Sequence, residues 1–210
     1  MNEYYELTRK RFQQPGIAEI YEKSRFGTLK GKFLKYREEN IARDILARAG
    51  RELKVLDVPC GTGRFGAVLK QYADVLIGAD ISKPMLESSR KRGQYSELRR
   101  CEIENMPFPN GYVDVLACFR LLHHLPSEDR ARAFAEIHRV TKRYFIFTFN
   151  TKASIAHVIN KIILRKSFYS ETMKTMRQEL ENYFTVRQTF RILPFVAGET
   201  IVFCEKKVRP

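Results

Sequence analysis

The sequence predicts an α/β protein in which a mostly parallel sheet carries helices on both faces. Strand-like and helix-like segments alternate through the middle of the chain, and a glycine-rich turn follows the first strand-like run. Two further strand-like runs lie close together near the C-terminal end. Alternation of this kind is typical of parallel sheets covered on both sides by helices, and the final two runs predict an antiparallel pair.

Seven short runs have the apolar character of strands. They are residues 54–58, 75–80, 98–103, 113–119, 144–149, 185–193 and 199–205. The segment 194–198 between the last two is short enough for a hairpin connection.

Helices are predicted between most of these strands. The N-terminal 50 residues are expected to be mostly helical, and 41–49 is their clearest amphipathic piece. Ser127 is predicted to cap the helix that follows the fourth strand, because acidic residues fill the first turn after it. The remaining predicted helices are residues 65–72, 84–92 and 170–183.

Length and composition bound the possible functions. The chain has 210 residues, 44% of them hydrophobic, which fits one globular domain. Its longest apolar run, 153–164, is interrupted by polar residues, and its start lacks an apolar signal region, so we expect a soluble, cytoplasmic protein. The four cysteines lack C-x-x-C spacing and are expected to be reduced, mostly buried thiols, with no metal site.

The chain is strongly basic. Lys and Arg number 38 against 24 Asp and Glu, a net charge of +14. Such a charge admits nucleic acid, an anionic membrane or a small anionic substrate as partner. Residues 55–150 carry only +3, while 1–54 carry +5 and 151–210 carry +6. Because the excess lies on the flanks, it favours an anionic small molecule or lipid over nucleic acid.

The glycine-rich turn predicts a nucleotide-containing ligand. After Asp57 the chain places Gly61, Gly63 and Gly66 in a G-x-G-x-x-G spacing. Glycines let the chain turn tightly and let a ligand lie against bare main chain. Asp80 ends the next predicted strand, where a carboxylate can accept hydrogen bonds from ribose hydroxyls. The pattern fits either a nicotinamide dinucleotide or S-adenosylmethionine.

Three features favour S-adenosylmethionine. Asp57 would repel a pyrophosphate but attract the ammonium group of an amino acid. Glu102 follows the third predicted strand, where it can accept a hydrogen bond from an adenine amino group. The fourth predicted strand leads into residues 118–125, CFRLLHHL.

On these motifs the chain resembles the class I S-adenosylmethionine-dependent methyltransferases, and most closely the small-molecule group that includes the ubiquinone/menaquinone-biosynthesis enzymes. The family's glycine loop matches residues 57–63, its adenine segment 102–108 and its histidine segment 121–125, although Pro59 replaces the family's first glycine. The resemblance implies a Rossmann-like, seven-stranded, mostly parallel sheet with an antiparallel last strand, and S-adenosylmethionine as cofactor.

The resemblance also implies the residues of the site. Those expected to bind the cofactor are Asp57, Pro59, Gly61, Gly63, Asp80, Ile81, Met85, Glu102, Ile103 and Phe119. His124 is the candidate general base, with a packed core histidine as the alternative. Those expected to bind the acceptor are Tyr21, Arg25, Arg120 and His123. Arg120 can hold an anionic group or, equally, pair with an acid of the chain.

The chain is expected to be a single methyltransferase domain with three parts. Residues 1–39 would form a helical lid, 40–150 the cofactor-binding core, and 151–210 an acceptor-side insertion with a terminal hairpin. Within the last part, 155–166 has an apolar face flanked by basic residues. Such a segment can contact a membrane surface peripherally, cap a hydrophobic substrate, or pack on its own domain.

The leading functional hypothesis is methyl transfer to a small-molecule or lipid-like acceptor, with the flanking charge favouring an anionic one. The alternatives are an RNA or protein methyltransferase and a non-catalytic cofactor-binding or scaffolding protein. Against a base-methylating enzyme, residues 120–125 lack an N/D-P-P-Y/F-type motif.

Overall fold

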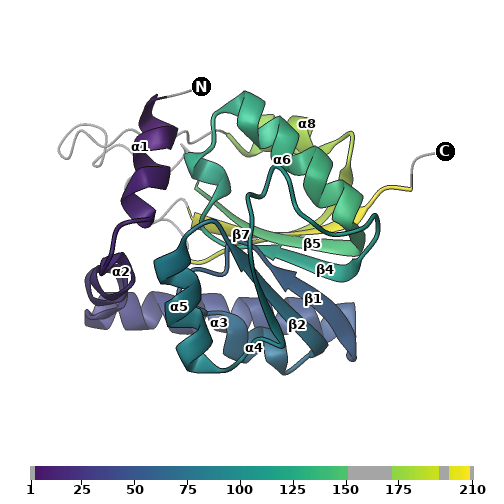
Figure 1. The fold of residues 1–210 in the computed structure, drawn as a ribbon. Helices are drawn as coiled ribbons and strands as arrows, with labels where there is room; N and C mark the ends of the chain where they lie inside the picture. Colours follow the sequence, from purple (N-terminus) through teal and green to yellow (C-terminus); the bar gives the residue numbers. More distant parts are fainter. Residues whose placement is uncertain (1–2, 151–171, 194–198, 209–210) are drawn as a thin grey trace.

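A seven-stranded sheet forms the centre of the molecule (Figure 1). The computed structural model describes residues 3–150, 172–193 and 199–208. Across the sheet the strands follow the order β3-β2-β1-β4-β5-β7-β6. Their bounds are β1 Leu53–Asp57, β2 Ala73–Asp80, β3 Glu97–Arg100, β4 Val113–Cys118, β5 Thr141–Asn150, β6 Phe184–Arg191 and β7 Glu199–Lys206.

The strand directions confirm the predicted fold class. β1 runs parallel to β2 and β4, β2 to β3, and β4 to β5. β7 is antiparallel to both of its neighbours, β5 and β6. The fold is therefore Rossmann-like, with the last strand inserted antiparallel.

Helices cover both faces of the sheet. Figure 1 shows α6 and α8 above it and α3, α4 and α5 below it. The helix bounds are α1 Glu3–Phe12, α2 Ile17–Phe26, α3 Leu29–Ala49, α4 Gly66–Lys70, α5 Lys83–Arg92, α6 Ser127–Val140 and α8 Met173–Leu180, with a single 3₁₀ turn, η1, at Leu122–His124.

Each face of the sheet buries its own apolar core. β5 illustrates the cause, since side chains of a strand alternate between faces. Phe145 and Phe147 pack on the face covered by α6 and α8, where Phe134 meets them. Ile146 points to the other face and packs with Ile45 of α3. Burial on both faces explains why these strands read as nearly continuous apolar runs.

The structure corrects two of the sequence-based expectations. β3 ends at Arg100, not residue 103, because the chain turns at a bridge between Glu102 and Asn105. Pro126, not Ser127, occupies the N-cap of α6, and no side chain caps that helix. The expected division of the chain into three parts stays a prediction; its first boundary lies within α3.

Three further expectations concern the segment 155–166, membrane-spanning helices and the cysteines. The predicted amphipathic segment 155–166 lies outside the described residues. Within the described part, each helix is too short or too polar to cross a bilayer. All four cysteines are free, and Cys60, Cys118 and Cys204 are buried.

Candidate cofactor and acceptor site

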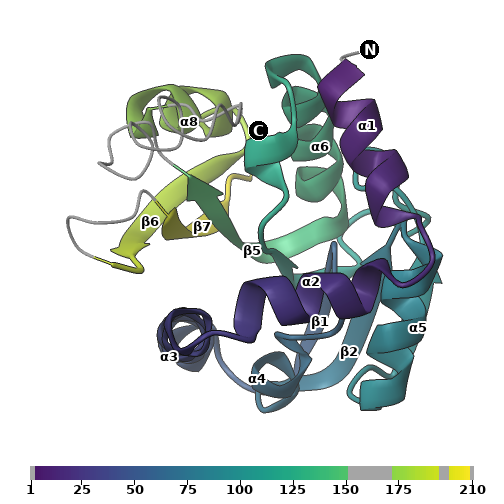
Figure 2. The ribbon, with the colours of Figure 1, turned by 90° about the vertical axis from the view of Figure 1, so that its left-hand side faces the viewer.

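The predicted site residues gather at the C-terminal ends of the parallel strands β1, β2, β4 and β5, which form one edge of the sheet. Figure 2 faces this edge and shows α1 and α2 lying across it. We refer to α1 and α2 together as the cover. Crevices at this edge of open α/β sheets are where ligands bind in such folds.

The glycine loop after β1 leaves its main chain bare. Gly61 and Gly63 have φ angles of 55° and 80°, in the left-handed region that favours glycine. A Cβ added at Gly61 would meet no atom within 4 Å, so the loop faces open space there. Pro59, which replaces the family's first glycine, does not occupy a position of positive φ. The loop can therefore take this shape with proline at that position.

Asp80, at the end of β2, organises the loop. One carboxylate oxygen accepts the backbone N–H of Gly61 at 2.9 Å, and the other accepts that of Ser82 at 2.8 Å. Burial raises the pKa of Asp80 to about 6, although these hydrogen bonds oppose the rise. Each oxygen retains lone-pair capacity for a further donor such as a hydroxyl group.

Asp57, at the end of β1, is held by a tyrosine from the segment between α5 and β3. The Tyr95 hydroxyl donates to its carboxylate at 2.6 Å. The ring of Tyr95 passes over Gly78 in β2, where a Cβ would come within 2.8 Å of it, so a glycine is required there. Burial, with a contribution from Asp80, raises the pKa of Asp57 to about 7.

These features fit an adenosyl cofactor that carries a cation. Two neighbouring buried carboxylates with raised pKa values gain a favourable partner when a positive group approaches. Bare main chain at Gly61 gives such a ligand room. The residues present therefore suit the cofactor that the sequence predicts.

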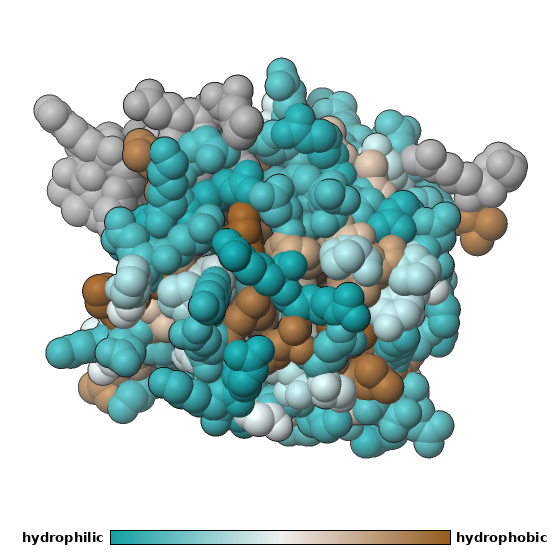
Figure 3. Space-filling view, in the orientation of Figure 1, coloured by the Kyte–Doolittle hydropathy of each residue, from teal (hydrophilic) through white to brown (hydrophobic). Residues whose placement is uncertain are grey.

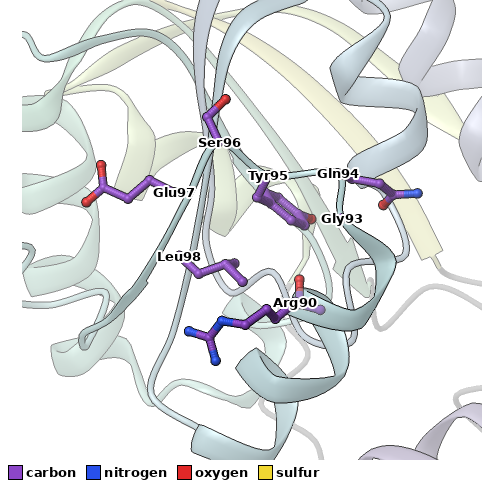
Figure 4. A pocket seen from close by; sticks show the side chains of 8 residues that line it. Arg90, Gly93, Gln94, Tyr95, Ser96, Glu97 and Leu98 are labelled. Carbon is purple, nitrogen blue, oxygen red and sulfur yellow. The ribbon is translucent and has the colours of Figure 1, made fainter.

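A surface pocket of about 160 Å³ lies elsewhere, where α5 ends and β3 begins. Figure 4 shows Tyr95 within it, between Gln94 and Leu98. Its volume is well below the roughly 300–1,000 Å³ of small-molecule sites. It lies at the opposite end of α5 from Ser82 and is not the predicted crevice.

The cover contacts the predicted cofactor segments directly. Arg9 of α1 pairs with Glu102, the predicted adenine acceptor. Glu22 of α2 accepts a hydrogen bond from Thr62 in the glycine loop. The Ser82 hydroxyl donates to the carbonyl of Phe12. In this conformation the cover holds the groups that a cofactor would contact.

The other predicted cofactor residues lie around the same edge. Met85 packs against Ile17 and Ala18 of the cover. Ile81 offers its carbonyl to Arg100 at 3.0 Å. Ile103 is buried in the α6-side core, and Phe119 stacks on Phe65 with ring centroids 3.7 Å apart. Their predicted role toward a cofactor stays a prediction.

Arg120, predicted to bind the acceptor, pairs with two acids of the chain. Its guanidinium meets Glu38 of α3 and lies 3.0 Å from Glu199 of β7. Its φ of 63° is unusual for a residue with a side chain. Thr148 stabilises this conformation by accepting the backbone N–H of Arg120 at 2.6 Å.

Glu38 joins this pair to the glycine loop. Its carboxylate is fully buried and accepts from Arg64 as well as from Arg120. Within the described residues, Nη1 of Arg64 and Nε of Arg120 are buried without a hydrogen-bond partner. Buried donors in this state favour an additional acceptor.

The two histidines lie beside this network and are uncharged at neutral pH. Burial and nearby Arg25 lower the pKa of His124 to about 4. His123 is more deeply buried, and burial, His124, Arg120 and Arg25 together lower its pKa well below the usual range. Arg25 is an exposed residue of the cover, and Tyr21, one turn earlier, is half-buried. The structure thus brings all four predicted acceptor residues near the end of β4.

Comparison with known proteins agrees with this geometry. Residues 56–147 match a family model described as a methyltransferase domain. This match and the fold support a class I S-adenosylmethionine-dependent methyltransferase domain. Its matched residues begin in β1, include the glycine loop and the histidine pair, and end in β5.

Relatives of this methyltransferase domain differ in their acceptors. The chain is 30% identical over 99 residues to a malonyl-[acyl-carrier protein] O-methyltransferase of Hamiltonella defensa, covering 47% of this chain and 38% of that one. It is 35% identical over 97 residues to a ubiquinone/menaquinone biosynthesis C-methyltransferase of Ralstonia pickettii, covering 42% and 39%. The chain therefore spans about two fifths of the length of these relatives.

A solved structure resembles this chain over nearly its whole length. Magnesium protoporphyrin IX methyltransferase of Synechocystis PCC 6803, solved with bound SAH, superimposes with a TM-score of 0.77. The two chains share 18% identity over 96% of this chain and 99% of that one. At this identity the likeness concerns the fold.

Sequence reasoning missed four residues that build the candidate site: Glu38, Arg64, Tyr95 and Glu199. Among these four residues, only Glu38 has a sequence pattern that indicates a buried position. It falls three and seven residues before Ile41 and Ile45, on the buried stripe of α3. A charged residue on an apolar helix face indicates a buried partner. The partners themselves come from distant parts of the chain.

Proposed function

We propose that the protein transfers a methyl group from S-adenosylmethionine to an oxygen of an anionic small molecule, and that this oxygen belongs to a carboxylate. The observation that carries the proposal is the juxtaposition of two sites at one sheet edge. Asp57, Asp80 and bare Gly61 lie on one side, and an arginine-rich network with neutral histidines lies on the other. Bound there, the cofactor supplies a methyl group already activated on a sulfonium.

The chain's own residues would hold the cofactor by charge and by hydrogen bonds. Asp57, once ionised, attracts the ammonium group of the amino-acid portion. Asp80 accepts from ribose hydroxyls while it keeps Gly61 and Ser82 in place. Glu102 would accept a hydrogen bond from the adenine amino group once its ion pair with Arg9 is broken. Alignment of the two reactants and exclusion of water would provide most of the rate enhancement.

The acceptor side favours an anion. Arg25, Arg64 and Arg120 face two glutamates, Glu38 and Glu199, which leaves one positive charge in excess. The buried donors on Arg64 and Arg120 would each gain an acceptor from a bound carboxylate. Guanidinium groups suit carboxylates because both are planar and can pair through two hydrogen bonds.

His124 supports a carboxylate rather than a hydroxyl acceptor. A histidine with a pKa of about 4 is uncharged at neutral pH and is a weak proton acceptor. A hydroxyl group must lose its proton during transfer, whereas a carboxylate is already ionised. The uncharged ring also avoids repelling the sulfonium. General-base catalysis by His124 remains the alternative, and it requires a hydroxyl acceptor.

Calorimetric titration with S-adenosylmethionine and S-adenosylhomocysteine tests the cofactor half of the proposal. We expect Asp80→Asn to weaken binding by roughly 10- to 100-fold, since charge-assisted hydrogen bonds are lost. Asp114→Asn is the matched control. Asp114 accepts the N–H of Lys54 at 2.9 Å, like Asp80 with Gly61, but at the opposite edge of the sheet. Wild-type protein that binds neither ligand would overturn the proposal.

A radiolabel assay tests the acceptor half. With tritiated methyl cofactor and a panel of carboxylic acids and their alcohol analogues, we expect label only on the acids, released as methanol by alkali. Arg25→Gln should lower kcat/KM about tenfold or more for the acids. Arg11→Gln, which also removes an exposed arginine of the cover, should not. Labelling of the alcohols, lost in His124→Asn, would show a hydroxyl acceptor instead.

A further inference from the structure

The beginning of α3 presents an apolar stripe to solvent. Leu29, Phe33 and Tyr36 are 86%, 53% and 62% exposed. They lie at positions i, i+4 and i+7, so they share one face of the helix. That face is opposite the one on which Gly31, Glu38 and Ile45 are buried. We call Leu29, Phe33 and Tyr36 the α3 stripe.

Cations flank the α3 stripe on both sides. From Lys23 to Arg37 the chain has six basic residues and no acidic one. Helical spacing places Lys32 on one side of the stripe and Lys30 and Arg37 on the other. Lys30 and Lys32 are exposed, so their ammonium groups can extend away from the helix. In Figure 3, hydrophobic side chains are visible at the left-hand edge, over α2 and the beginning of α3.

We propose that the α3 stripe and its flanking lysines bind the surface of an anionic lipid bilayer. An apolar stripe bordered by cations is the pattern of a helix that lies in the membrane interface, its apolar side chains among the acyl chains and its lysines at the headgroups. The stripe lies on a convex helix and comprises three side chains. A stable protein interface buries roughly 1,200 Å² or more and needs a larger surface.

The position of the stripe suits delivery of a lipid-like acceptor. It begins three residues after Phe26, and Arg25 lies beside the histidine pair. A membrane bound at α3 would therefore lie next to the acceptor side of the site. This surface is separate from the groups that would hold the cofactor, so lipid binding and methyl transfer can fail independently.

Vesicle flotation tests the inference with the whole chain and no substrate. The probes are vesicles of phosphatidylcholine alone and vesicles in which a third of the lipid is phosphatidylglycerol. We expect binding only to the second kind, weakened as salt rises. Lys30→Gln with Lys32→Gln should weaken partitioning about 30-fold. Phe33→Ser with Leu29→Ser should abolish it.

Two matched controls isolate the surface. Lys91→Gln with Lys174→Gln makes the same change in charge at exposed positions on α5 and α8. Val208→Ser removes an apolar side chain that is 92% exposed near the C-terminal end. Both controls should bind like wild type, and circular dichroism should show all variants folded.

Several results would overturn the inference. They are equal binding to both kinds of vesicle, no binding to either, and equal losses in the α3 variants and their controls. Binding to poly-L-glutamate without binding to vesicles would also overturn it, since the surface would then recognise an acidic polypeptide.

Discussion

The sheet and its cover are held in place by different kinds of interaction. Phe145, Phe147 and Phe134 are fully buried between β5 and α6. The cover rests on a small apolar cluster around Ile17 and Met85, and otherwise on polar contacts such as that between Arg9 and Glu102. Buried apolar area stabilises strongly, whereas partly exposed ion pairs contribute little. The cover should therefore open at a much lower free energy than the sheet.

This difference suits a protein whose proposed ligand site lies between the two regions. Hydrogen bonds within the sheet edge and from Tyr95 hold Asp57, Asp80 and the glycine loop in place. The cover, which contacts Thr62, Ser82 and Glu102, can exchange those contacts for contacts to a ligand. Five predictions test this difference between the sheet and the cover.

The largest effect is expected in the sheet. Phe147→Ala should lower the free energy of unfolding by about 3–5 kcal/mol, because a fully buried ring leaves a cavity. Urea denaturation measures the change. Phe33→Ala, at a half-exposed position of α3, is the control and should stay within about 0.5 kcal/mol of wild type. Similar losses in both variants would contradict the comparison.

Glu38 of α3 joins the glycine loop to the segment after β4, and its loss should rank second. Glu38→Gln should lower the free energy of unfolding by about 3 kcal/mol, because Arg64 and Arg120 remain buried without their carboxylate. Glu39→Gln, which breaks the more exposed pair with Lys35, should cost under about 1 kcal/mol. If the two variants denature at the same urea concentration, the buried pairs of Glu38 stabilise the protein no more than an exposed ion pair does.

The third prediction concerns pH and Asp57. The pKa of Asp57 rises from 3.8 to about 7 on folding, so the folded state binds more protons between these values. Its contribution to the free energy of unfolding must then fall as pH rises from 4 to 7. His124 acts in the opposite sense below pH 6.5, so the quantity to measure is the difference between wild type and Asp57→Asn. A difference that is constant across this range would contradict the assignment.

Cofactor binding should show the reverse dependence on pH. The ammonium group requires ionised Asp57, so wild-type affinity for S-adenosylhomocysteine should increase from pH 6 to pH 8. In Asp57→Asn the affinity should be weaker and nearly flat over the same range. Titration calorimetry at a series of pH values distinguishes the two profiles.

The smallest effect on stability is expected in the cover. Arg9→Ala should change the free energy of unfolding by under about 1 kcal/mol, since its pair with Glu102 is partly exposed. Hydrogen exchange at the amides of α1 should nevertheless become several-fold faster, with β5 unchanged. Arg99→Ala, which removes a pair with Glu97 outside the cover, is the control. Unchanged exchange in α1 would show that other contacts hold the cover.

Local patterns were sufficient for most of the fold. The order of strands and helices follows from apolar runs and from the turn after Asp57, because period and composition are local properties. The ends of strands and helices were predicted less accurately. The predicted third strand continued to Ile103, whereas the chain turns after Arg100, since strand ends depend on where pairing with β2 stops. Similarly, Pro126 takes the N-cap that the pattern assigned to Ser127.

The candidate site shows the same difference between features set by local sequence and features set by contacts between distant residues. Sequence patterns were enough to locate the glycine loop, the two acids that end β1 and β2, and the histidine pair after β4, since each follows directly from a strand end. The folded structure was needed to show that Tyr95 holds Asp57, that Arg9 pairs with Glu102, and that Glu38 joins Arg64 to Arg120. Those contacts connect residues up to 93 positions apart. Ion pairs and hydrogen bonds between distant residues leave no periodic trace in a sequence, because they depend on how the helices cross the sheet edge.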